Sequence, residues 1–155
     1  EEKGYDYALL LADKLPEYDF IFPFLGEPVG NIVHDPCSWD TGLSDLVATA
    51  DLVLVPSVWS NTPEAATLKS LLMGKQIIYF KSEFSFESEA IQDLGISLTG
   101  SHILDALKIR DFVTQKKHQQ YNQVGRDFAE NFISVSEHRL GKIIANSKNN
   151  FNEKI

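Results

Sequence analysis

The most constraining feature of this sequence is a strand–helix–strand pattern between residues 51 and 80. A continuous apolar run, "DLVLV", is followed by a polar stretch, the helical segment "PEAATLKSLLM" and a second apolar run, "QIIYF". Short continuous apolar runs are typical of strands buried on both faces, which occur mainly in parallel sheets. The alternation of such strands with helices predicts a mostly parallel sheet with helices on both faces.

Similar segments alternate along the rest of the chain. Helices are predicted within residues 4–16, 41–50 and 86–94 and from 101 onward with a break at 133–136, and strands at 19–24, 31–34 and 96–98. The connection between the first two strands is too short for an ordinary parallel crossover, which needs about a dozen residues. Either this crossover is compact or one of the two strands is antiparallel at an edge.

The composition limits the class of protein. The chain has 155 residues, of which 43% are apolar, and a formal net charge of −8 without a basic stripe. We therefore expect one domain with a real core, and neither nucleic acid nor an anionic membrane as its partner. The single cysteine, Cys37, excludes an internal disulfide, and the histidines lack ligand spacing, so we expect no metal and no cofactor. No apolar run is long enough for a membrane span, and a cytoplasmic location is expected.

The polar stretch after "DLVLV" is a candidate anion site. Pro56 ends the run, so residues 57–62 would form a loop at the carboxyl end of a strand, where ligands bind in parallel sheets. The next helix would begin near Thr62 or Pro63 and would direct its first backbone N–H groups at a bound phosphate. The alternative is that this stretch only caps the helix.

The segment "ADLVLVPSVWSNTPEAATLKSLLMGKQII" resembles the signature of the GT-B glycosyltransferases, in particular the family 4-like group. Further segments follow in the family's order: "EKGYDYALLLADKLPEYDFIF", "GNIVH", "SEAIQDLGISL" and "GRDFAENFISVSEHRLGKII". The first is similar to the family's Lys-Gly segment, helix and second strand, and the last to its closing helices. The resemblance extends from Lys3 to about Ile144.

This resemblance implies a donor-binding domain over residues 1–147 and a polar tail over residues 148–155. The implied fold is a Rossmann-like, doubly wound, mostly parallel sheet whose first strand lies upstream of Glu1. The implied activity is transfer of a sugar from a nucleotide diphosphate donor, with retention at the anomeric carbon and without a metal. An N-terminal acceptor domain outside this chain would complete the enzyme and could attach it peripherally to a membrane, and this part alone should transfer nothing.

The resemblance also implies roles for single residues. Lys3 matches the lysine that contacts the donor diphosphate, and its partner arginine would lie upstream of this chain. Asn61 and Lys69 stand where the family has its paired glutamates. Asn61 can still hydrogen-bond a sugar hydroxyl, whereas Lys69 offers only donors and is a poor substitute for a ribose-binding carboxylate. Glu64 either replaces one carboxylate or is a first-turn glutamate that interacts favourably with the helix dipole.

Two residues near the same edge complete the candidate site. His34 ends a strand where the family often places the nucleotide base, although a structural histidine is the alternative. Trp39 could stack on a base or cover the edge of the core. The candidate catalytic residues are Lys3 and Asn61, and the candidate donor-binding residues are Ser57, Ser60, Thr62, Pro63, Glu64, Ala65, Lys69, His34 and Trp39.

Two other functions share this fold. The lost glutamate pair favours a degenerate, non-catalytic relative that binds or assembles with a partner. A nucleotide-sugar epimerase of GT-B shape is the second alternative, and analysis of the reaction product would separate it from a transferase.

Overall fold

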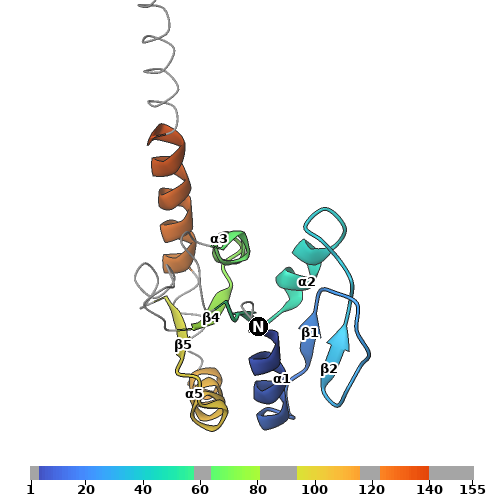
Figure 1. Cartoon of the computed structure of the whole chain (residues 1–155). Helices are drawn as coiled ribbons and strands as arrows, with labels where there is room; N and C mark the ends of the chain where they lie inside the picture. The colour runs from blue at the N-terminus through green and yellow to red at the C-terminus, as the bar shows by residue number, and fades with distance from the viewer. Residues whose placement is uncertain (1–3, 58–63, 81–93, 116–122, 140–155) are drawn as a thin grey trace, which may run out of the picture.

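The computed structural model describes residues 4–57, 64–80, 94–115 and 123–139, and shows a mixed α/β protein (Figure 1). Its elements are α1 (Tyr5–Lys14), β1 (Phe20–Phe22), β2 (Ile32–His34), α2 (Leu43–Thr49), β3 (Leu52–Val55), α3 (Ala65–Leu72), β4 (Gln76–Phe80), β5 (Gly95–Leu98) and α5 (His102–Thr114). A further helix covers residues 123–139. The apolar runs thus predict the strands to within two residues at each end.

The strands form two parallel sheets. One contains β1 and β2, and the other has the order β3-β4-β5. Among the described residues, β1 and β2 thus pair with none of β3, β4 and β5, and a break separates the two sheets. The link from β1 to β2 is the compact crossover of the two alternatives, because the two strands pair in parallel across the short loop 23–31. An isolated antiparallel bridge between Val29 and Ile32 tightens this loop.

Helices cover both faces of the three-stranded sheet, and successive residues of β4 pack against helices on opposite faces. Ile78 of β4 packs on one side with α1 and α5, in a core that includes Leu11 and Ile109. Its neighbours Ile77 and Tyr79 point to the other side, where they pack with Leu71 of α3 and with Ala129. In Figure 1, α1 and α5 accordingly lie below the strands, and α3 and helix 123–139 lie above them.

Helix α1 connects the two sheets. Its core residue Leu11 belongs to a cluster against which Phe20 of β1 and Leu54 of β3 also pack. At its beginning, the ring of Tyr5 meets Phe22, at the end of β1, with 5.2 Å between ring centroids. Gly4 lies directly on Pro56, at the end of β3. The start of α1 therefore sits at the carboxyl ends of both β1 and β3.

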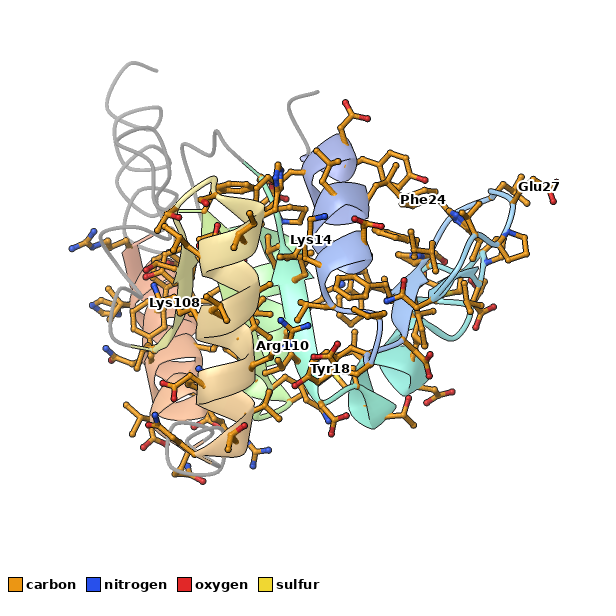
Figure 2. The ribbon with its side chains drawn as sticks, turned by 90° about the horizontal axis from the view of Figure 1, so that it is seen from below. Lys14, Tyr18, Phe24, Glu27, Lys108 and Arg110 are labelled. Atoms are coloured by element: carbon orange, nitrogen blue, oxygen red, sulfur yellow. The ribbon has the colours of Figure 1, made fainter. Side chains whose placement is uncertain are left out.

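The other end of α1 is fixed by side chains from distant elements. The Asn31 amide donates to the carbonyl oxygens of Leu15 and Tyr18 at 2.9 and 2.7 Å, and so attaches the turn that follows α1 to the start of β2. Arg110 of α5 pairs with Glu17 and donates to the carbonyl oxygen of Lys14. Figure 2 shows Arg110 directed from α5 toward the segment between Lys14 and Tyr18.

The C-terminal described helix differs from the sequence-based expectation. A break was expected at 133–136, but the helix runs without interruption over residues 123–139. Residues 133–136 contain no proline or glycine, and the Ser136 hydroxyl donates to the carbonyl oxygen of Phe132 within the helix at 2.8 Å. Arg126 attaches the helix to α3 by donating to the carbonyl oxygen of Leu72. Of the helix predicted at 86–94, residues 86–93 lie outside the described residues.

Candidate functional site

The candidate site lies where the carboxyl ends of the strands meet the beginnings of α1 and α3. Pro56 and Ser57 follow β3 directly, and α3 begins at Ala65, three residues later than the earliest start expected for it. The side chain of Ala65 is exposed, whereas that of Thr67 in the same turn is buried. Ser57 thus lies just beyond the carboxyl end of β3, and Glu64 directly precedes α3.

Ser57 and Glu64 are held together across the loop that separates them. Ser57 is only 6% exposed, and its hydroxyl donates to the Glu64 carboxylate at 2.9 Å. Glu64 is the N-cap residue of α3, with extended backbone angles, and its carbonyl oxygen accepts from the Leu68 N–H at 3.2 Å. A carboxylate at this place interacts favourably with the helix dipole. Both readings of Glu64 therefore remain compatible with its position, and its carboxylate already has one partner in the protein.

Trp39 and Lys69 form a cation–π pair at the same edge. The Lys69 ammonium lies 4.5 Å from the centroid of the Trp39 ring. Trp39 belongs to the loop between β2 and α2, and Lys69 lies in the second turn of α3, so the pair joins the two parts of the molecule on either side of the break. The loop is fixed locally, because the Ser38 N–H donates to the Thr41 hydroxyl at 2.8 Å and the Thr41 N–H donates back to Ser38.

His34 lies in an aromatic cluster at the end of β2. Its ring stacks on Phe22, with centroids 5.6 Å apart, and meets the edge of Phe24 at 5.3 Å. Its Nδ1 donates to the Phe24 carbonyl oxygen at 3.1 Å, and Gly26 lies so close over the ring that any added Cβ would overlap it. These contacts favour the structural role for His34 over contact with a base.

Neither thiol chemistry nor a metal site is apparent in the part of the chain that the structure describes. Burial, and then the charge of Asp35, raises the pKa of the Cys37 thiol, which disfavours the thiolate needed for nucleophilic attack. Among the described residues, no group of three or more His, Cys, Asp or Glu side chains is placed to hold an ion. Over the same residues, no helix has the length and apolar character needed to cross a bilayer.

One polar cluster at this edge has no counterpart among the residues predicted from the sequence. Asp105 of α5 is completely buried, and accepts hydrogen bonds from the Tyr7 hydroxyl, the Thr99 N–H and hydroxyl, and the Gly100 N–H. The ring of Tyr7 lies between Phe80, at the end of β4, and His102. Burial, followed by the hydrogen bond to Asp105, raises the pKa of Tyr7 above its usual range. The partners are 98 residues apart, so no local pattern could have indicated this pair.

The structure thus brings four of the candidate residues together in two pairs, Ser57 with Glu64 and Trp39 with Lys69. His34 is at the same edge but faces its own cluster. The candidates Lys3, Ser60, Asn61, Thr62 and Pro63 lie outside the described residues.

Comparison of the chain with protein-family models, with curated proteins and with solved structures finds no match.

Proposed function

We propose that this chain is the nucleotide-sugar-binding part of a GT-B glycosyltransferase that uses a nucleotide diphosphate donor. The observation that carries the proposal is the direction in which the chain leaves the break between β1 and β3. From β1 the chain proceeds outward to β2, and from β3 it proceeds outward on the other side to β4 and β5. In parallel sheets, such a reversal of strand order creates a crevice at the carboxyl ends in which nucleotides bind.

The proposal includes a specific fold, in which all the strands belong to one doubly wound sheet. Both β1 and β3 have one edge paired and one edge toward the break, and α1 packs beside both. An additional parallel strand between them would join the two small sheets and would lead directly into the start of α1 at Gly4. The separation of the two sheets supports this arrangement.

In the proposed reaction, an acceptor hydroxyl oxygen bonds to the anomeric carbon while the bond from that carbon to the donor phosphate oxygen breaks. Negative charge gathers on the leaving diphosphate, which takes up the hydroxyl proton. Lys3, a cation from the upstream segment and the first backbone N–H groups of α3 would stabilise that charge. Asn61 would hold a hydroxyl of the sugar, and the acceptor would come from a domain outside this chain. The small, exposed Ala65 at the start of α3 supports the close approach of a phosphate.

Calorimetric titration of the chain with UDP, GDP and ADP tests the proposal. We expect saturable binding of at least one of them. Lys3→Ala should weaken this binding about ten- to a hundredfold, because a charge-assisted hydrogen bond contributes roughly 1.5–3 kcal/mol. The same change should leave binding of the nucleoside unaffected. Lys14→Ala, which removes an exposed lysine at the opposite end of α1, is the matched control.

The second candidate is a non-catalytic module with the same fold. The engagement of Lys69 by Trp39 and of Glu64 by Ser57 favours it, because two candidate donor-binding groups already have partners in the protein. Failure of all three nucleotides to bind would support this candidate and would contradict the transferase proposal.

A further inference from the structure

We propose that Trp39 and Lys69 bind opposite ends of a nucleotide ligand. The nucleotide base replaces the Lys69 ammonium on the Trp39 ring, and the released ammonium pairs with the ligand's phosphate. This inference rests on the proposed function, because it specifies how a nucleotide diphosphate would occupy the same site. It starts from the 4.5 Å separation between the ammonium and the ring centroid.

The two partners differ in their freedom to move. Trp39 is half-buried in a loop fixed by the hydrogen bonds between Ser38 and Thr41. Lys69 is exposed on α3, and its charge is carried on a flexible four-carbon chain. A ligand that competes for the ring would therefore displace the ammonium and leave the indole in place.

The exchange is energetically favourable for a ligand that offers both an aromatic ring and a phosphate. An exposed cation–π contact is weaker than the stacking of a base on an aromatic side chain. The displaced ammonium would then gain a charge-assisted hydrogen bond to phosphate, which is also stronger than the contact that it loses. A nucleoside offers only the ring, and pyrophosphate offers only the charge, so each would use one half of the pair.

The position of the pair supports a ligand that crosses the break between the sheets. Trp39 follows β2, on one side, whereas Lys69 lies one turn from Ala65, at the start of the helix that follows β3. The ligand's base would thus lie on the β1–β2 side, and its phosphates would lie toward the first turn of α3.

The test measures the affinities of UDP, ADP, uridine, adenosine and inorganic pyrophosphate for the chain and three variants. Trp39→Leu should weaken the nucleotides and nucleosides by about tenfold and leave pyrophosphate within twofold. Lys69→Met should weaken the nucleotides and pyrophosphate by about tenfold, and should leave the nucleosides unchanged or bound slightly more tightly, because the ring is then unoccupied. Lys14→Met, on the far end of α1, should change none of the affinities.

Two conservative variants separate a binding role from a structural one. Trp39→Phe should keep most of the nucleoside affinity, and Lys69→Arg should keep most of the pyrophosphate affinity, whereas a loss caused by misfolding would not be rescued in this ligand-specific way. If the parent chain binds a nucleotide and the affinities of both Trp39→Leu and Lys69→Met stay within twofold of the parent's, this proposal is refuted while the proposed function survives. If the parent binds none of the nucleotides, both proposals fail.

Discussion

At the scale of single residues, two glycines show how the same backbone conformation can serve different purposes. Gly4 and Gly30 both have positive φ, at 69° and 62°. An added Cβ at Gly4 would overlap the carbonyl oxygen of Pro56, whereas nothing lies within 4 Å of one at Gly30. Gly4 is thus needed for the approach of α1 to the end of β3, while Gly30 only shapes an exposed loop.

Gly4→Ala should therefore destabilise the chain more than Gly30→Ala. Both substitutions place an L side chain in the left-handed region, at a cost of roughly 1–2 kcal/mol. Gly4→Ala should cost at least about 1 kcal/mol more, because either Pro56 or the start of α1 must shift to relieve the overlap. Urea unfolding of the two variants measures the difference. Equal losses of unfolding free energy would show that the contact between Gly4 and Pro56 adds nothing to the backbone strain.

At the scale of elements, the structure is held together by polar contacts that the helical and strand patterns do not reveal. Asp105 attaches the turn between β5 and α5 to the first half of α1, through Tyr7. Arg110 attaches α5 to the other end of α1. The two helices lie side by side on one face of the sheet, as the view in Figure 2 shows, and these two contacts fix both ends of that arrangement.

The pair of Tyr7 and Asp105 should make the chain sensitive to alkali. Because the folded-state pKa of Tyr7 is raised, the folded chain keeps this proton at pH values where the unfolded chain loses it. The stabilisation is fully present below about pH 10, the usual pKa of tyrosine, and is lost as the pH rises toward the folded-state pKa. Tyr7→Phe should lower the unfolding free energy at neutral pH by roughly 1.5–3 kcal/mol, since it removes a hydrogen bond to a charged group.

Measurement of unfolding free energy from pH 7 to pH 11 tests this prediction. The Tyr7→Phe variant should lose less stability between pH 10 and pH 11 than its parent. Tyr5→Phe, which removes a hydroxyl from the same helix and keeps the ring that packs on Phe22, is the control and should follow the parent. A Tyr7→Phe variant with the parent's alkaline slope would contradict the assignment.

The sequence predicted the elements better than it predicted their contacts, for physical reasons. The runs "DLVLV" and "QIIYF" are buried from both sides, so their composition alone marks β3 and β4. The positions of Ser57 after β3 and of Glu64 before α3 follow from the order of strand, loop and helix in the sequence. The pairing of Trp39 with Lys69 depends instead on how the loop after β2 crosses toward α3, and the burial of Asp105 depends on a partner in α1. No local sequence pattern predicts either of these two contacts.

At the scale of the whole molecule, the chain has two small sheets, β1–β2 and β3–β4–β5, and this division limits how much apolar surface the strands bury. The residues of β3 are less buried than those of β4, although both are flanked by helices on two faces. Ile21 of β1 is 46% exposed, and so is its register partner Val33. Strand β3, at the edge of its sheet, therefore buries less apolar surface than the central strand β4.

An extended apolar segment placed directly before residue 1 should fill the break. We expect such an extension, with five consecutive valine and isoleucine residues, to slow hydrogen exchange in both β1 and β3, because it would pair with both edges. A control extension that alternates glycine and serine should leave exchange unchanged. If the apolar extension protects neither strand, the proposal of a single continuous sheet is wrong, whatever the chain binds.

The contacts of Asn31 and Asp105 differ in the length of chain that each must close. The hydrogen bonds of Asn31 to Leu15 and Tyr18 span 16 and 13 residues, whereas that of Asp105 to Tyr7 spans 98. Loop-closure entropy rises with the logarithm of loop length, so the longer closure costs roughly 1.5–2 kcal/mol more. The α1–β1–β2 unit can therefore assemble through contacts between residues close in sequence. The docking of α5 on α1 requires closure of a segment that is nearly two thirds of the chain.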